Sequence, residues 1–218
     1  MLYSFDKSLL GFCKNRKIKS LPLYILNDLK NLDSTDLINI EQKRFLKSAF
    51  DLERDKFGFF PNKEGNLSGA IAIIKALKEP QQSIIDHAAK LSKKLPDKKW
   101  AINFVSIFEE NDKYNFFLGW GLSFYNFSIK GKKEGRIQSQ TLCLNKGKEV
   151  ISKILLEKCF AEIRGIFLTR DLINLPPNIL TPYNYEKIIK NSLKEFAPKF
   201  TSYKDKQLEK NFPLINIV

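Results

Sequence analysis

The sequence predicts an α/β fold in which a mixed or largely parallel sheet is flanked by helices. Short apolar runs that are typical of strands alternate with longer segments in which apolar residues recur at helical spacing. Such alternation favours a layered architecture, because each apolar face must be buried against another element. No internal repeat or low-complexity segment interrupts the pattern. A chain of 218 residues is also long enough to bury one substantial hydrophobic core.

The first part of the chain contains two strand candidates and one helix candidate. A proline at the start of the first apolar run fits a strand, because proline is tolerated there. A Pro-Asn-Lys-Glu-Gly sequence has the chemistry of a turn. The expected order is a loose basic arm over 1–20, a strand over 21–26, turn-rich residues over 31–36, a helix over 37–51, a strand over 57–60 and a turn over 61–65.

The middle of the chain continues the alternation. The apolar run over 70–77 is ambiguous by pattern, but its short length and the flanking Gly69 and Pro80 favour a buried strand. The remaining expected elements are a helix over 83–95, a strand over 100–108, an aromatic-rich helix over 112–127, a polar turn over 131–135, a strand over 141–144 and a long helix within 147–174.

The long helix is followed by a rigid turn and a further helix. Pro176 and Pro177 end the long helix, because neither has an N–H and each disfavours the α region in the residue before it. Thr181 is a good N-cap, and Pro182 fits the first helical position. Apolar residues then recur at helical period from Tyr185 to Phe196.

Composition narrows the function classes. The net charge of +13 comes mostly from lysines spread along the whole chain, with only six arginines, so nucleic-acid binding is not the favoured main role. Three distant cysteines argue against a disulfide framework and for a reducing compartment, so a cytoplasmic location is expected. We expect neither a signal peptide nor a membrane span, because no apolar run is long enough.

Few residues could carry chemistry. His87 is the single histidine, so a metal site of the His-Glu-x-x-His type is impossible, and it is expected to lie half-buried or exposed on a helix. Cys159 is expected to be a buried structural thiol. The acidic cluster at Glu109, Glu110 and Asp112 is expected at a helix N-terminus rather than around a metal ion.

Common nucleotide and nucleophile motifs are absent from the sequence. Gly119-x-Gly121 lacks the third glycine of a dinucleotide loop, so its small residues are expected to let neighbouring elements pack closely. There is no phosphate loop of the G-x-x-x-x-G-K-[ST] type, no Gly-x-Ser-x-Gly elbow and no Cys-x-x-Cys pair. The sequence therefore nominates no catalytic residue and no metal ligand.

The turn after the long helix carries a resemblance to a known family. Its motif resembles the junction between the N-terminal and catalytic domains of the leucyl (cytosol) aminopeptidases. The residues that carry it are Arg170, Asp171, Asn174, Pro176, Asn178, Thr181 and Pro182. From their residue types alone, we expect these side chains to pair, to cap helices and to fix a turn rather than to catalyse.

Two further stretches occur in the order that the resemblance requires. Residues 117–127 are similar to an aromatic helix before the junction, and residues 211–218 resemble the approach to the first catalytic-domain strand. The resemblance implies a macro-domain-like N-terminal α/β domain over 1–146, a linking helix over 147–175 and the start of a truncated catalytic domain over 176–218. On this interpretation the chain ends in an apolar strand where the catalytic domain begins.

The resemblance also implies an activity for the whole protein. Leucyl aminopeptidases release N-terminal amino acids from peptides with two divalent ions, manganese or zinc, and they assemble as hexamers. The motifs that hold those ions would lie beyond Val218, so this portion alone is expected to bind no metal and to be inactive. The alternative is a stand-alone basic α/β module that binds a nucleotide or nucleic acid without catalysis.

Overall fold

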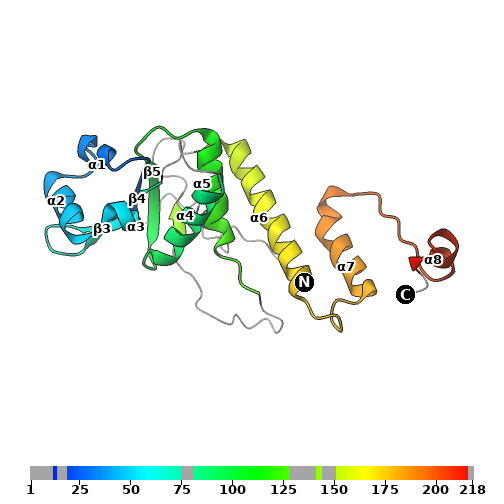
Figure 1. Cartoon of the computed structure of the whole chain (residues 1–218). Helices are drawn as coiled ribbons and strands as arrows, with labels where there is room; N and C mark the ends of the chain where they lie inside the picture. The colour runs from blue at the N-terminus through cyan, green and yellow to red at the C-terminus, as the bar shows by residue number, and fades with distance from the viewer. Residues whose placement is uncertain (1–11, 14–18, 75–80, 128–140, 144–150, 216–218) are drawn as a thin grey trace. The chain divides into compact units, whose positions relative to one another are not determined.

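A computed structural model describes residues 12–13, 19–74, 81–127, 141–143 and 151–215 (Figure 1). These residues divide into two compact units, one that ends at Asp171 and one that begins at Leu172. The first unit contains the sheet and its covering helices, and the second contains short helices only.

The first unit is built on a six-stranded mixed sheet in the order β1-β6-β5-β2-β4-β3. Every described pair of neighbouring strands is parallel except β3 and β4, which are antiparallel. The predicted α/β class and mixed sheet are confirmed. The strands are β1 (Phe12–Cys13), β2 (Leu21–Leu26), β3 (Phe57–Pro61), β4 (Leu67–Ile73), β5 (Lys99–Phe104) and β6 (Thr141–Cys143).

The second half of strand β4 is apolar because both faces of the sheet are covered there. Along β4, Ala70 and Ala72 belong to one hydrophobic cluster, whereas Ile71 and Ile73 belong to another. Successive side chains of a strand point to opposite faces, so these two clusters lie on the two sides of the sheet. A strand buried on both faces shows no polar alternation, which explains why its sequence pattern was ambiguous.

Three short helices cover one face of the sheet. They are α1 (Lys30–Ser34), α2 (Ile40–Ala49) and α3 (Leu52–Asp55), and each buries one leucine against the β4 isoleucines. Helix α2 begins at a capping box, in which the Gln42 N–H donates to Asn39 Oδ1 (2.8 Å) and the Asn39 N–H donates to Gln42 Oε1 (3.3 Å). This pair satisfies two N–H groups that the helix itself leaves free.

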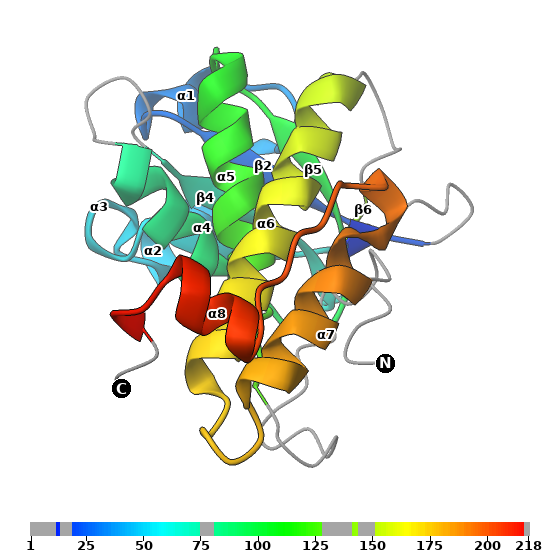
Figure 2. The ribbon, with the colours of Figure 1, turned by 90° about the vertical axis from the view of Figure 1, so that its right-hand side faces the viewer.

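Three longer helices, α4 (Gln81–Lys94), α5 (Glu110–Leu122) and α6 (Lys153–Asn174), belong to the opposite cluster. Helix α5 lies beside α6 in both ribbon views (Figures 1 and 2). A Cβ added at Gly119 would lie 2.2 Å from the Ile85 carbonyl oxygen on α4, and one at Gly121 would lie 2.3 Å from Ile163 Cδ1 on α6. Close packing at Gly119-x-Gly121 is therefore confirmed.

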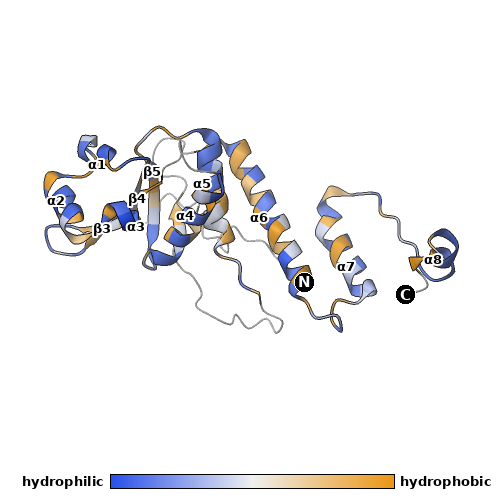
Figure 3. Cartoon of the chain, viewed as in Figure 1, coloured by the Kyte–Doolittle hydropathy of each residue, from blue (hydrophilic) through white to orange (hydrophobic). Residues whose placement is uncertain are grey.

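The second unit contains α7 (Pro182–Leu193), a 3-10 turn η2 (Lys194–Phe196) and α8 (Lys206–Asn211). None of the described residues from 172 to 215 is buried. Apolar residues nevertheless recur along α7, as the orange bands in Figure 3 show. Several large ones are exposed, among them Tyr183 (67%), Phe196 (69%) and Leu214 (81%).

Several predicted elements are confirmed with shifted boundaries. The strand over 21–26 and the helix over 83–95 match β2 and α4 within two residues. The strand over 100–108 is too long, because β5 ends at Phe104 and the chain then leaves the sheet. Further elements are shifted as well. Helix α2 spans 40–49 rather than 37–51, α5 spans 110–122 rather than 112–127, β3 ends at Pro61 rather than 60, β4 begins at Leu67 rather than 70, and α6 begins at Lys153.

Other predictions are wrong. Helix α1 occupies part of the stretch that was expected to be turn, and β1 lies in the expected basic arm, where Phe12 packs on Phe160 with ring centroids 5.1 Å apart. Of the strand expected at the end of the chain, only Leu214 and Ile215 are described, and they lie in a turn after α8, which ends at Asn211. The rest of that expected strand lies outside the described residues. A strand needs a hydrogen-bonding neighbour, and no described strand pairs with this segment.

The turn expected over 131–135, and the parts of predicted elements at 75–77, 144, 147–150 and 216–218, lie outside the described residues. Among the described helices, none has the length and hydrophobicity needed to cross a membrane.

Candidate functional site

The junction predicted from the sequence has the local structure that its residues favour. Helix α6 ends at Asn174, and α7 begins at Pro182 after Thr181. The Asn184 N–H donates to Thr181 Oγ1 (3.3 Å), so Thr181 caps α7 as expected. Between the helices, the Pro176 carbonyl accepts hydrogen bonds from the N–H groups of Ile179 and Leu180 at 2.9 and 2.8 Å. The turn is thus ordered by its own backbone.

Asp171 is the one buried charged residue of the junction motif, at 3% exposure. Its Oδ1 accepts a hydrogen bond from the Tyr125 hydroxyl (3.0 Å), and the Arg170 guanidinium lies 5.3 Å from the centre of the Tyr125 ring. The same ring packs edge-on against Phe167 at 5.1 Å. Arg170 and Asp171 therefore tie the end of α6 to the segment after α5, a fixing role of the kind expected from their residue types.

The remaining motif residues lie elsewhere. Asn174, Pro176, Asn178, Thr181 and Pro182 all belong to the second unit, where Asn178 is exposed. Tyr125 was not predicted as a partner of Asp171, because 46 residues separate the two and no sequence spacing relates them. The only available signal was its place in the aromatic stretch that precedes the junction.

A second polar group lies between α5 and α6. The Tyr114 hydroxyl donates to Glu162 Oε2, and burial together with this carboxylate raises the pKa of Tyr114. Cys159, fully buried on α6, has a pKa raised to about 12, mainly by burial and also by Glu162. A thiol with such a pKa is not ionised near neutral pH and is a poor nucleophile. The interpretation of Cys159 as a structural thiol is confirmed.

The other candidate residues also have structural roles or lie on helix surfaces. Glu109 caps α5, and Glu110 and Asp112 lie in its first turn, as expected for acidic residues at a helix N-terminus. His87 is half-buried on α4, with its Nδ1 3.3 Å from Ser83 Oγ. Within the described residues there is no group of three or more His, Cys, Asp or Glu side chains able to hold a metal ion.

Comparison of the sequence with known protein families finds no match, and comparison with curated proteins finds none either. Solved structures do match. Cytosol aminopeptidase from Coxiella burnetii aligns with a TM-score of 0.73 at 19% identity, over 94% of this chain and 42% of that one. The fold is that of the N-terminal portion of the cytosol aminopeptidases. The resemblance to leucyl aminopeptidases is thus confirmed at the level of the fold.

Two further structures support the same assignment of fold. A mutant of tomato leucine aminopeptidase aligns with a TM-score of 0.58 at 15% identity, over 92% of this chain and 45% of that one. The bottromycin maturation enzyme BotP aligns with a TM-score of 0.60 at 11% identity, over 88% of this chain and 41% of that one. The chain therefore spans less than half the length of each of these three structures.

Proposed function

We propose that this chain is the N-terminal portion of a leucyl-aminopeptidase-family metallopeptidase that releases N-terminal amino acids from peptides. One observation carries the proposal: 94% of the chain aligns with a cytosol aminopeptidase structure, but only 42% of that structure is covered. The junction motif from Arg170 to Pro182 adds support, because it is the part of the sequence that resembles the family most closely. The catalytic domain would occupy the uncovered remainder.

The reaction would depend on residues outside this chain. In the proposed enzyme two divalent ions, manganese or zinc, would activate a bridging water and polarise the peptide carbonyl. The described residues offer no cluster that fits such ions, and no catalytic step is assigned to them. We expect the 218-residue chain alone to be inactive and to bind neither ion at such a site.

The two units would then have different roles. Residues 1–146 would form an accessory α/β domain, residues 147–175 a linking helix, and residues 176–218 the first elements of the catalytic domain. Exposed apolar side chains between Ile173 and Ile215 support the assignment of residues 176–218 to the catalytic domain, because large exposed apolar patches mark packing or interaction surfaces. The whole enzyme would be a cytoplasmic homo-oligomer, a hexamer as the resemblance implies.

The test is an arylamide assay of the complete gene product. The coding region is sequenced past Val218, and the product is assayed with an amino-acid arylamide and Mn²⁺ or Zn²⁺, with and without a chelator. We expect chelator-sensitive release of the arylamine by the long product and none by the 218-residue chain. A stop codon directly after Val218, or a long product without activity, would contradict the proposal.

The alternative is a stand-alone binding module for a nucleotide or nucleic acid. The net charge of +13 favours it over other non-enzymatic roles. It predicts salt-dependent binding of DNA or RNA by the 218-residue chain. The arylamide assay distinguishes the two proposals, because a binding module would show no peptidase activity either as the 218-residue chain or as the complete gene product.

A further inference from the structure

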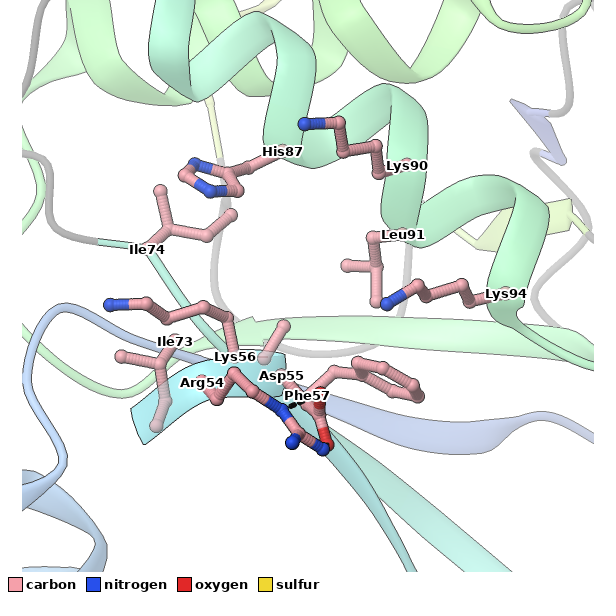
Figure 4. Close-up of a pocket in the computed structure, with 11 residues that line it drawn as sticks. Arg54, Asp55, Lys56, Phe57, Ile73, Ile74, His87, Lys90, Leu91 and Lys94 are labelled. Atoms are coloured by element: carbon pink, nitrogen blue, oxygen red, sulfur yellow. Dashed lines mark hydrogen bonds and ion pairs between the residues drawn. The ribbon is translucent and has the colours of Figure 1, made fainter. Parts of the chain in front are cut away.

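The first unit contains a cavity of about 200 Å³ between α4 and the start of β3 (Figure 4). Four lining residues of α4 follow one another at helical spacing, so they share one side of that helix. The residues before and at the start of β3 form the opposite wall, and the end of β4 contributes Ala72, Ile73 and Ile74. The four from α4 are His87, Lys90, Leu91 and Lys94.

The charge of the lining is strongly one-sided. Its cationic side chains are Arg54, Lys56, Lys90 and Lys94, and its one carboxylate is Asp55. That carboxylate is already engaged by the neighbouring guanidinium, with Arg54 Nε 3.2 Å from Asp55 Oδ1. Among the described residues no carboxylate lies within 4.0 Å of the ammonium groups of the three lysines. The cavity lining therefore carries three lysine charges that have no carboxylate partner among the described residues.

The backbone at Lys56 is held in an uncommon conformation at this cavity. Its φ of 60° and ψ of 13° lie in the left-handed region, which costs a non-glycine residue about 1–2 kcal/mol. The conformation is fixed on the sheet side, where the Lys56 carbonyl accepts the Ile73 N–H at 2.8 Å. A glycine would adopt it without that cost, whereas the lysine adds a cationic side chain to the cavity lining.

The apolar part of the lining increases the electrostatic attraction between these lysines and a bound anion. Leu91, Ile73 and Ile74 are buried, and Phe57 is half-buried with the Lys94 ammonium 4.2 Å from its ring centre. Electrostatic attraction is stronger beside such a low-dielectric surface than in open water. Lysine binds phosphate as a compact point charge. The volume is below the roughly 300 Å³ at which sites for drug-sized ligands begin, so only a compact ligand fits.

We propose that this cavity binds a small phosphate-bearing anion, either inorganic phosphate or pyrophosphate or the phosphate group of a small phosphomonoester. The ammonium groups of Lys56, Lys90 and Lys94 would neutralise its charge. This site is independent of the proposed peptidase activity, because its residues all lie in the first unit and outside the junction motif.

The proposal is tested by titrating the purified 218-residue chain with inorganic phosphate, pyrophosphate and adenosine monophosphate in low-salt chloride buffer. Isothermal calorimetry gives affinities, and amide chemical shifts in NMR spectra locate the site. We expect saturable pyrophosphate binding with a dissociation constant on the order of 1 mM or tighter, with the largest shifts at Lys56, Phe57 and His87. If adenosine monophosphate binds more tightly than inorganic phosphate, the ligand is a phosphomonoester. If the two bind equally, the ligand is the free anion.

Two double variants distinguish anion binding at this cavity from non-specific attraction of anions to a basic protein. Lys90→Gln with Lys94→Gln removes two charges from the cavity, and Lys93→Gln with Lys98→Gln removes two exposed charges that do not line it. We expect the first pair to weaken pyrophosphate binding at least about tenfold and the second less than about twofold. Equal losses in both pairs, no saturation by about 20 mM, or tight duplex DNA binding weakened equally by both pairs would overturn the proposal.

Discussion

The two units of this chain differ in how their apolar residues are used. In the first unit Trp100 and Trp120 are both fully buried, within a cluster that spans the sheet and helices α4, α5 and α6. In the second unit no described residue is buried, although α7 has an apolar stripe of the same kind. An amphipathic pattern in the sequence thus predicts a helix, but it does not tell whether a core exists for that helix.

The difference matters for stability. The first unit is held by long-range packing, which supplies most of the favourable free energy of folding. The described contacts of the second unit are mostly local ones between side chains and turns that are not buried, such as the Thr181 cap, the ion pairs at Glu186 and the contact of the Tyr203 and Phe212 rings. Helices of this length are marginal without tertiary packing. The two units should therefore respond differently to mutation.

The largest expected effect is that of Trp120→Ala. Removing a fully buried tryptophan should lower the free energy of unfolding by about 3–5 kcal/mol, because it leaves a cavity that the surrounding structure fills only in part. Phe196→Ala, at a side chain that is 69% exposed, should change it by less than about 0.5 kcal/mol. Urea unfolding followed by circular dichroism measures both. Comparable losses would show that the second unit has a core of its own.

The next largest change in stability is expected from a pair of glycine-to-alanine variants. Gly119→Ala should destabilise by about 1–3 kcal/mol, because its Cβ would lie 2.2 Å from a backbone oxygen that cannot move aside. That loss outweighs the gain of about 1 kcal/mol expected for alanine in a helix. At Gly165, where no atom lies within 4 Å of an added Cβ, the same substitution should stabilise instead. The urea midpoint should therefore fall for Gly119→Ala and rise for Gly165→Ala. A rise for Gly119→Ala would mean that α4 and α5 are not in close contact.

The sequence predicted most of the first unit, because its elements carry strong local signals. Alternation of apolar runs and helical patterns was enough for β2 and α4. In the second unit, helical periodicity and proline chemistry placed α7 and its Thr181 cap. The two-residue strand β1 was missed, since a segment so short is a strand only through its pairing with β6. Helices α1 and α3, of five and four residues, are likewise too short for periodicity to show.

The candidate sites were less predictable. The junction motif was found from the sequence, but the contact of Asp171 with Tyr125 depends on tertiary packing. The cavity brings together residues of α3, β3, β4 and α4, and lysines spread along a basic chain give no sign of such a gathering. Only the structure shows that three of these lysines line one cavity and that none of the three has a carboxylate partner among the described residues.

A smaller effect is expected at the cap of the second unit. Thr181→Ala removes the hydroxyl that accepts the Asn184 N–H, which should cost about 1 kcal/mol locally. Amide protection in α7 should therefore fall about fivefold in native-state hydrogen exchange. Protection in β2 should stay unchanged, because the cap belongs to the other unit. A fall in both would mean that the two units unfold together.

The smallest effect concerns pH. Hydrogen bonds from the ammonium groups of Lys190 and Lys204 lower the pKa of Glu186 to about 2, below its usual 4.5. A carboxyl whose folded pKa is lowered stabilises the folded form above its unfolded pKa, and that stability is lost as the pH falls. Protection of α7 amides should thus decline between pH 4.5 and 2.

Glu186→Gln should abolish that decline, because the amide does not titrate. Both lysines are about half exposed, at 48% and 52%, so added salt should reduce the effect in the wild-type chain. The carboxyl ¹³C shift of Glu186 reports its titration directly. A midpoint near 4.5 would show that the two ion pairs do not hold in solution. Local contacts in the second unit would then be weaker still than the absence of buried side chains among its described residues implies.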